Sequence, residues 1–245
     1  MTALITGATG GLGAALVRAL AADGHLVAIG YHRNRPRAEQ LLTEIGRGMV
    51  VQGDLADPNR DVIASTMVAE VRRTLGNIDV LVNNAADQQT GDWRDQSAAE
   101  VEAMFAATYG SVVAMTRAAL PAMSAGSHVI NIVSVEAFVP FAQHAHYAAA
   151  KAAVVSLTRS MAQDLRSQRI SVHAVAPGLI DRPGLAEAWP EGVRDWSDTA
   201  PLGRPVTADE VAQEVVALSR RTDVSGAVTP VDGGWLSAMH PPTWQ

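Results

Sequence analysis

Several features that would define a function class are absent from this sequence. It contains no cysteine, which excludes disulfides, thiolate nucleophiles and metal sites with cysteine ligands. No stretch of 18 or more apolar residues occurs, so no transmembrane helix is predicted. The net charge is −6 without blocks of like charge, and the basic cluster HRNRPR at 32–37 is too short for a nucleic-acid surface. The N-terminus shows no secretory signal. We therefore expect a cytoplasmic protein without nucleic-acid or membrane partners.

The size and composition of the chain favour a single large core. Its 245 residues are 48% hydrophobic, and no linker or repeat divides them. We expect one domain over 1–245. The only long irregular segment, 178–206, is rich in proline and glycine and is predicted to be a lid or loop over the substrate.

Short apolar runs alternate with helical patterns along the chain. The runs are continuously apolar, as is typical of strands covered on both faces. Leu12, Leu16 and Leu20 mark the buried face of the first helix. This alternation predicts an α/β fold with a doubly wound parallel sheet and helices on both faces. Strands are predicted at 2–6, 25–30, 48–53, 78–83, 127–133, 170–176 and 227–232, and further helices near 37–46, 57–75, 97–124, 145–168 and 207–221.

A glycine-rich loop, TGATGGLG at 6–13, separates the first strand from the first helix. Gly7, Gly11 and Gly13 allow a tight turn and a close approach of the backbone to a pyrophosphate. The first turn of the helix then offers free N–H groups to the anion. A simple strand–helix turn is the alternative interpretation, and the position between strand and helix favours a dinucleotide site.

The end of the second strand indicates which dinucleotide is bound. An NAD site usually has a carboxylate there, but the sequence is AIGYHRNRPR and no acidic residue occurs before Glu39. Arg33, with Arg35 or Arg37 in support, is suited to pair with a 2′-phosphate. The alternative is a solvated basic turn, and Gly10 lies where a basic residue often accompanies NADP. We expect NADP(H) rather than NAD.

Five motifs in order resemble the classical short-chain dehydrogenase/reductase family. They are the glycine loop, Asn-Asn-Ala-Ala at 83–86, Ser134, Tyr147-x-x-x-Lys151 and Pro177-Gly178. The sequence is similar to 3-oxoacyl-[acyl-carrier-protein] reductases within that family. The resemblance implies a seven-stranded Rossmann sheet of order 3-2-1-4-5-6-7 and a homotetramer or dimer. Beside the glycines, Arg33, Tyr147 and Lys151, it implies cofactor contacts from Thr9, Leu12, Asp54, Leu55, Asn83, Ala85, Pro177, Gly178 and Ile180.

The catalytic residues make chemical sense together. Side chains at i and i+4 of a helix are neighbours, so the Lys151 ammonium is expected to lower the pKa of the Tyr147 phenol, which is ordinarily about 10. Ser134 lies at the end of the fifth strand and can donate to the substrate oxygen. The resemblance implies hydride transfer between NADP(H) and a carbonyl or secondary alcohol, with Tyr147 as general acid or base. The alternative function is a cofactor-binding regulator or scaffold that has lost turnover.

Some positions depart from the family pattern or leave two interpretations open. Thr108 replaces an asparagine that holds a water in a proton relay, and it either keeps that role or is an ordinary helix residue. Arg182 replaces a threonine expected to contact the nicotinamide carboxamide. Glu136 is either a substrate contact or a solvated loop carboxylate, and His144 either lines the substrate pocket or packs elsewhere. No zinc-like spacing of histidines is present, so no metal is expected.

Overall fold

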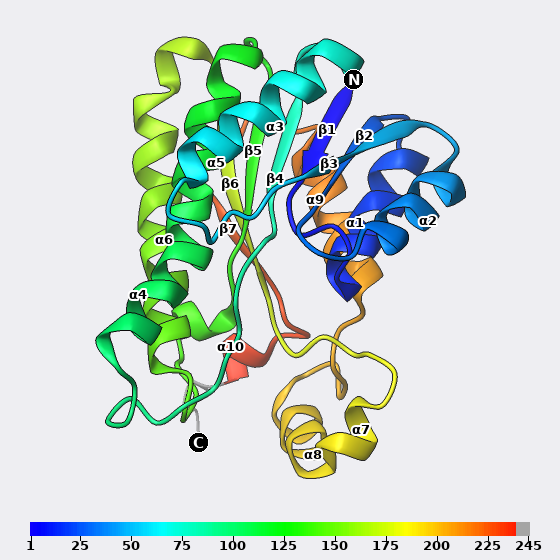
Figure 1. Ribbon diagram of the computed structural model, residues 1–245. Coiled ribbons are helices and arrows are strands. Elements are labelled where there is room, and N and C mark those ends of the chain that lie inside the picture. The colour runs from blue at the N-terminus through cyan, green and yellow to red at the C-terminus, as the bar shows by residue number, and fades with distance from the viewer. Residues whose placement is uncertain (239–245) are drawn as a thin grey trace.

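The computed structural model describes residues 1–238 and has a parallel sheet at its centre (Figure 1). The strand order is β3-β2-β1-β4-β5-β6-β7, and every neighbouring pair is parallel. Both the doubly wound fold and the predicted strand order are confirmed. The strands are β1 (Thr2–Ile5), β2 (Leu26–Tyr31), β3 (Gly48–Gln52), β4 (Val80–Asn83), β5 (His128–Ile132), β6 (Ser171–Pro177) and β7 (Val228–Val231).

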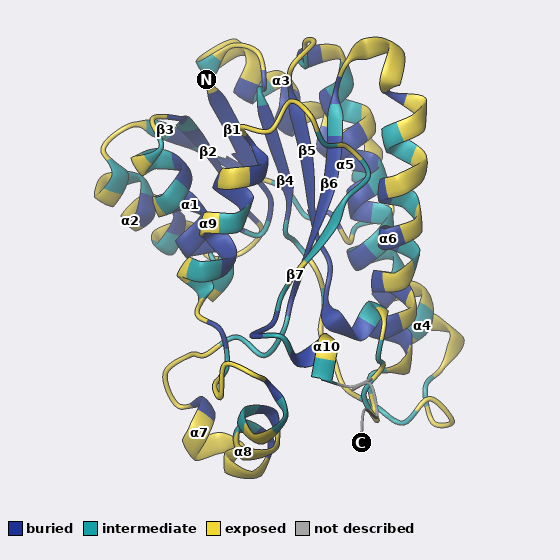
Figure 2. Cartoon of the chain, turned by 180° about the vertical axis from the view of Figure 1, so that it is seen from behind, coloured by how far each residue is buried: buried dark blue, intermediate teal, exposed yellow. Residues whose placement is uncertain are grey.

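Helices cover both faces of the sheet, which leaves the central strands buried on each side (Figure 2). One layer contains α1, α2 and α9, and the opposite layer contains α3, α5 and α6 (Figure 1). This double cover explains why the strand sequences are apolar without alternation. The helices of the two layers are α1 (Gly11–Ala22), α2 (Arg35–Ile45), α3 (Arg60–Leu75), α5 (Ser111–Ala119), α6 (Ala145–Asp164) and α9 (Ala208–Leu218).

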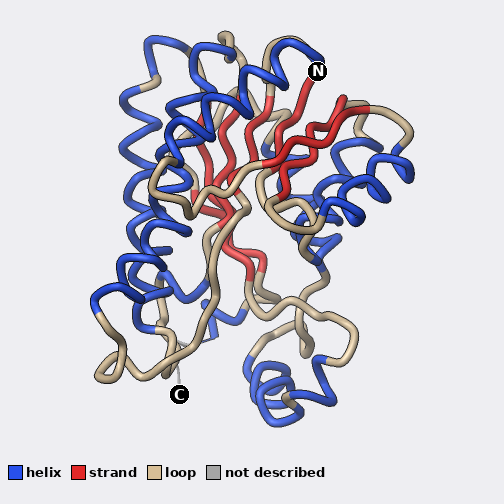
Figure 3. Tube along the Cα trace, viewed as in Figure 1, coloured by secondary structure: helices blue, strands red, loops and turns tan. Residues whose placement is uncertain are grey.

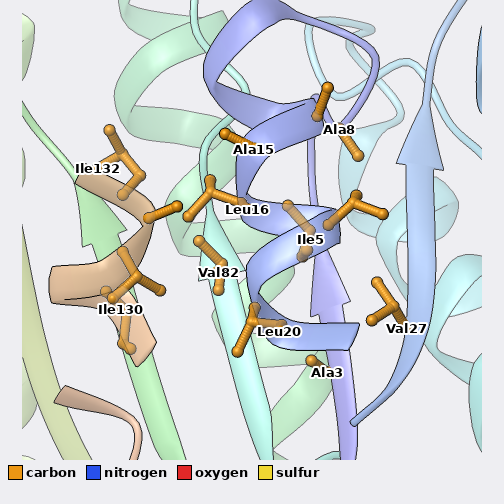
Figure 4. Packing of buried hydrophobic residues seen from close by; sticks show 14 of the residues in the cluster. Ala3, Ile5, Ala8, Ala15, Leu16, Leu20, Val27, Val82, Ile130 and Ile132 are labelled. Carbon is orange, nitrogen blue, oxygen red and sulfur yellow. The ribbon is translucent and has the colours of Figure 1, made fainter. Parts of the chain in front are cut away.

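The larger core cluster lies between the sheet and α1. Leu16 and Leu20 project from one face of α1 onto Ile5, Val82 and Ile130 of the three central strands (Figure 4). All five side chains are fully buried, and burying an aliphatic side chain of this size contributes about 1.5–3 kcal/mol. The predicted apolar face of the first helix therefore fixes the glycine loop against the sheet.

The helix predicted at 97–124 is helical without a break from 98 to 122, but it is not α-helical throughout. Ser97 and Glu100 form a capping box at the start of α4 (Ala98–Phe105), which runs into a π-helical turn at Ala106–Gly110 and then into α5. A 3₁₀ turn at Leu120–Ala122 ends the segment. A π turn adds a residue to one turn and rotates the side chains that follow, and such turns are frequent at functional sites. The apolar periodicity of the sequence does not indicate it.

The segment 178–206 is more regular than the sequence predicts. It contains α7 (Leu185–Ala188) and α8 (Pro190–Thr199), and Pro190 occupies the first position of α8, where its missing N–H costs nothing. A further short helix, α10 (Trp235–Ala238), follows β7 and was not predicted. Trp196 of α8 stacks on Trp235 of α10 at 4.8 Å between ring centroids, so the segment 178–206 is packed against the helix that follows β7.

The loops at the carboxyl ends of the strands gather on one side of the molecule (Figure 3). They include the glycine loop after β1 and the segments that follow β4, β5 and β6. In open parallel sheets, ligand sites lie at this edge. Within residues 1–238, no helix is long and apolar enough to cross a membrane.

Candidate active site

The glycine loop is shaped by two close backbone approaches. Gly7 has φ +61°, and a Cβ there would lie 2.9 Å from the Cα atom of Ala85. A Cβ on Gly13 would lie 2.4 Å from the carbonyl oxygen of Gly7. Gly11, by contrast, has open space beside it, and the helix N-cap at Gly10 makes no side-chain capping bond. The first turn of α1 therefore presents free N–H groups to a cavity, as a pyrophosphate site requires.

Asn84 fixes the glycine loop from the neighbouring strand end. Its side-chain amide donates to the carbonyl oxygens of Thr6 and Gly7, each at 3.0 Å, and its backbone N–H donates to the Thr6 hydroxyl. Sequence reasoning named Asn83 instead. Asn83 is the last residue of β4, and its amide is buried in the core, where it donates to the side chains of Thr116 and Asn131. Asn83 thus braces the sheet and does not reach the cavity.

The second strand ends beside one side of the cavity, as an adenosine site would require. Arg33 lines the cavity, and it forms no ion pair within residues 1–238. Arg35 instead pairs with Glu39 at 2.8 Å along α2, so the expected support from that residue is absent. Asp54 also lines the cavity and contacts His32 at 3.2 Å. The only cationic side chain of this basic turn that faces the cavity without a carboxylate partner is therefore Arg33.

The far end of the cavity is lined by the start of the segment 178–206, which the sequence predicts to be a lid. Pro177, Gly178 and Ile180 line it directly after β6, together with Arg182. A Cβ on Gly178 would lie 2.4 Å from the ring of Trp196, so the lid helix packs directly on the backbone at this point. Ile180 forms a parallel bridge with Val206 that closes the base of the lid.

Ser134, Tyr147 and Lys151 meet at this end of the cavity. Ser134 follows β5, and its hydroxyl accepts from the backbone N–H of Glu136 at 3.1 Å. Tyr147 and Lys151 lie one turn apart near the start of α6, with the Lys151 Nζ 5.7 Å from the centroid of the tyrosine ring. Nζ also donates to the carbonyl oxygen of Ile132 at 2.7 Å. The three predicted catalytic side chains are thus brought to one place from two elements.

Burial dominates the acidity of this site. Tyr147 is 3% exposed, and desolvation raises the pKa of its phenol to about 12, against smaller lowering effects from Gln88 and Ser134. Desolvation also lowers the pKa of Lys151 to about 8. The pKa of Tyr147 thus lies above the ordinary value of a phenol, and the lowering that we expected from Lys151 is not among the main effects that set it.

Thr108 lies outside the cavity. It is 0% exposed within the π turn, and its hydroxyl donates to the Met104 sulfur at 3.5 Å. Ala107, one residue earlier, lines the cavity in its place. The rotation of the π turn thus buries the hydroxyl, and the geometry favours the interpretation of Thr108 as a structural helix residue.

An acid–base pair of the buried Glu136 and the partly exposed His144 lies beside the tyrosine. Glu136 is 8% exposed, so it is not a solvated loop carboxylate, and its Oε2 lies 2.8 Å from Nδ1 of His144. Burial raises the pKa of Glu136, while His144 lowers it. The His144 ring meets the ring of Tyr147 edge-on at 6.0 Å. Both residues therefore form part of the wall around Tyr147.

One cavity of about 880 Å³ connects these parts, from the glycine loop to the lid. Every predicted catalytic and cofactor-binding residue lines it except Asn83 and Thr108. Sequence reasoning missed Gln88, which also lines the cavity, and whose amide donates to the Tyr147 hydroxyl at 3.0 Å. No motif contains Gln88, and its loop position was not derivable from periodicity.

Comparison with known proteins agrees with this geometry. Residues 1–192 match the short chain dehydrogenase family. The chain is 32% identical over 237 residues to meso-2,3-butanediol dehydrogenase of Serratia marcescens, covering 94% of this chain and 92% of that protein. It is 31% identical over 248 residues to 3-oxoacyl-[acyl-carrier-protein] reductase of Staphylococcus aureus, covering 95% and 97%. A Burkholderia cenocepacia short chain dehydrogenase solved in complex with NADP has a TM-score of 0.89 and 30% identity, covering 96% and 97%.

The fold and the cavity define an NAD(P)-dependent oxidoreductase built on a Rossmann sheet. The chain belongs to the short-chain dehydrogenase/reductase family, as the family match over most of its length and the identity to full-length relatives establish.

Proposed function

We propose that this protein is an NADP(H)-dependent reductase of a ketone or 3-oxoacyl-type carbonyl. The observation that carries the proposal is the meeting of Ser134, Tyr147 and Lys151 at one end of a cavity that begins at the glycine loop. When bound, the cofactor supplies a hydride to the carbonyl carbon. Ser134 donates a hydrogen bond to the carbonyl oxygen, and Tyr147 gives that oxygen a proton.

The protonated form of Tyr147 is the form that carbonyl reduction requires. A phenol with a pKa of about 12 stays protonated at neutral pH, so it is ready to donate. Alcohol oxidation needs the phenolate, which is scarce under the same conditions. Lys151 holds its ammonium next to Tyr147, where it favours the negative charge that remains on the phenol oxygen after proton transfer.

The residues of the cavity fit NADP(H). The open side of Gly11 and the free N–H groups of the first turn of α1 suit the pyrophosphate. Arg33 is placed to receive a 2′-phosphate, and Asp54, the nearby carboxylate, is occupied by His32. Lys151 and Ile180 would hold the nicotinamide ribose and ring at the other end. The absence of a carboxylate at the end of β2 supports NADP(H) over NAD.

Oxidation of NADPH, followed at 340 nm, tests the proposal. A panel of ketones, β-ketoesters and acyl thioesters should contain substrates that the wild-type protein reduces, with NADPH used faster than NADH. Tight NADPH binding without turnover across the whole panel would favour the second candidate, a cofactor-binding regulator. The intact catalytic residues speak against that candidate.

We further propose a cytoplasmic homo-oligomer, a tetramer or a dimer. Ala145, Ala149, Ala152 and Ser156 lie exposed along one side of α6, where small residues permit close approach of a second helix. Light scattering coupled to size-exclusion chromatography measures the mass directly. A mass of a single 25.7 kDa chain at micromolar concentration would refute the oligomer.

A further inference from the structure

A glutamine outside all of the sequence motifs contacts the catalytic phenol. Gln88 lies in the segment between β4 and α4, and its Nε2 donates to the Tyr147 hydroxyl oxygen at 3.0 Å. Gln88 also lines the cavity, so the contact is made at its catalytic end. Because Tyr147 is almost fully buried, water has little access to its oxygen, and a protein donor matters more there than at the surface.

Two other groups near the phenol oxygen are engaged elsewhere, whereas Ser134 makes a weaker hydrogen bond to it than Gln88 does. Thr108 donates to the Met104 sulfur, and Lys151 donates to the carbonyl oxygen of Ile132. Glu136, whose charge opposes formation of a phenolate, lies close enough to act on Tyr147. The amide of Gln88 therefore provides the larger of the two hydrogen bonds that favour negative charge on the phenol oxygen, against burial and the charge of Glu136.

We propose that Gln88 is a positioning residue for Tyr147, and that its amide N–H stabilises the phenolate formed when the proton passes to the substrate. In that step the O–H bond of Tyr147 breaks and an O–H bond forms on the former carbonyl oxygen. The carbonyl carbon is reduced by the hydride, and NADPH is oxidised to NADP⁺. Gln88 is unchanged throughout. The inference rests on the proposed function for its catalytic consequence, but its effect on the acidity of Tyr147 does not depend on turnover.

The first test compares Gln88→Met with Gln89→Met. Methionine has a similar length but no N–H donor, and Gln89 is an exposed neighbour whose amide bonds Asp87 instead. In alcohol oxidation, which uses the phenolate, Gln88→Met is expected to move the rising limb of the pH–rate profile up by about one pH unit. The rate below that limb then falls about tenfold. Gln89→Met is expected to match the wild type.

The second test measures the phenol without turnover. The protein has three tyrosines, so incorporation of fluorotyrosine gives few fluorine resonances, and Tyr147→Phe identifies the one from Tyr147. Its titration midpoint is expected to rise by about one pH unit in Gln88→Met and to stay unchanged in Gln89→Met. A purely structural role for Gln88 would not shift this midpoint.

The outcomes separate this inference from the proposed function. If the titration midpoint is the same in wild type and Gln88→Met, and only the KM for the carbonyl substrate rises, Gln88 contacts the substrate and the inference is wrong. If no substrate is turned over by the wild type, the proposed function fails. The titration of Tyr147 still decides whether Gln88 controls its acidity.

Discussion

His173 makes the stability of the fold depend on pH. It lies on β6, fully buried and stacked on His128 at 5.9 Å between ring centroids. Neither of its ring nitrogens has a hydrogen-bond partner among residues 1–238. Burial, followed by the nearby charges of His128 and Arg221, lowers the pKa of His173 to about 4. The folded protein therefore keeps this imidazole neutral at pH values where the unfolded chain protonates it.

The size of the effect follows from the two pKa values. The unfolded chain takes up a proton at His173 as pH falls through about 6.5, whereas the folded chain resists until about 4. Stability is therefore fully present above pH 6.5 and is lost as pH falls toward 4. Between pH 7 and pH 5 this one residue lowers the free energy of unfolding by about 2 kcal/mol.

Replacement of His173 by leucine removes this loss. Between pH 7 and pH 5, we expect the free energy of unfolding of His173→Leu to fall by about 2 kcal/mol less than that of the wild type. At pH 7 the variant is expected to be at least as stable as the wild type, because no hydrogen bond is lost. Urea unfolding, followed by tryptophan fluorescence at fixed protein concentration, measures both quantities. His32→Gln, at a side chain that is 44% exposed, is a control that should keep the wild-type loss. An equal loss in wild type and His173→Leu would refute the reasoning.

Three further substitutions test the cavity. Arg33→Ala should weaken NADPH binding about 10- to 100-fold in calorimetry and leave NADH binding unchanged, because a charge-assisted bond to the 2′-phosphate is lost. Arg35→Ala removes only the ion pair with Glu39 on α2 and should change the affinity for neither cofactor. If Arg33→Ala weakened the binding of NADPH and NADH equally, the assignment of Arg33 to the 2′-phosphate would be contradicted. Thr108→Val should keep kcat within about twofold of the wild type, since the Thr108 hydroxyl donates only to a thioether. A tenfold fall in kcat would instead support the interpretation that Thr108 holds a water in the proton relay. Gly13→Ala should destabilise the fold by about 1–3 kcal/mol, because its Cβ meets backbone atoms at 2.4 Å. Gly10→Ala, with its nearest neighbour at 3.7 Å, should have little effect on thermal unfolding, and equal effects of the two would refute the packing argument.

The fold was predictable because its signals are local and repeated. Continuous apolar strands and the apolar stripe of α1 indicate a covered parallel sheet without any knowledge of contacts. The positions after β1, β5 and β6 follow from the sheet, since the carboxyl ends of parallel strands share one edge. Ser134 and Pro177 could be placed at the cavity on that basis.

Two kinds of detail could not be predicted from the sequence: which way a side chain points from its element, and how deeply an element is buried. Asn83 and Asn84 are identical and adjacent, but the first lies within β4 and faces the core, while the second follows the strand and reaches the glycine loop. The π turn rotates Thr108 away from the cavity, and no known residue preference predicts such a turn. The pKa of Tyr147 depends on how deeply α6 is buried, which only the packed structure shows.

Single-turnover reduction with the Tyr147→Phe variant tests the central claim most directly. A ketone that the wild type reduces is mixed with the variant loaded with NADPH, and NADPH absorbance is followed at 340 nm. Loss of a general acid is expected to slow the reduction about 100- to 10,000-fold while NADPH still binds and the circular dichroism is unchanged. A Tyr147→Phe variant that reduces the ketone at the wild-type rate would contradict the account.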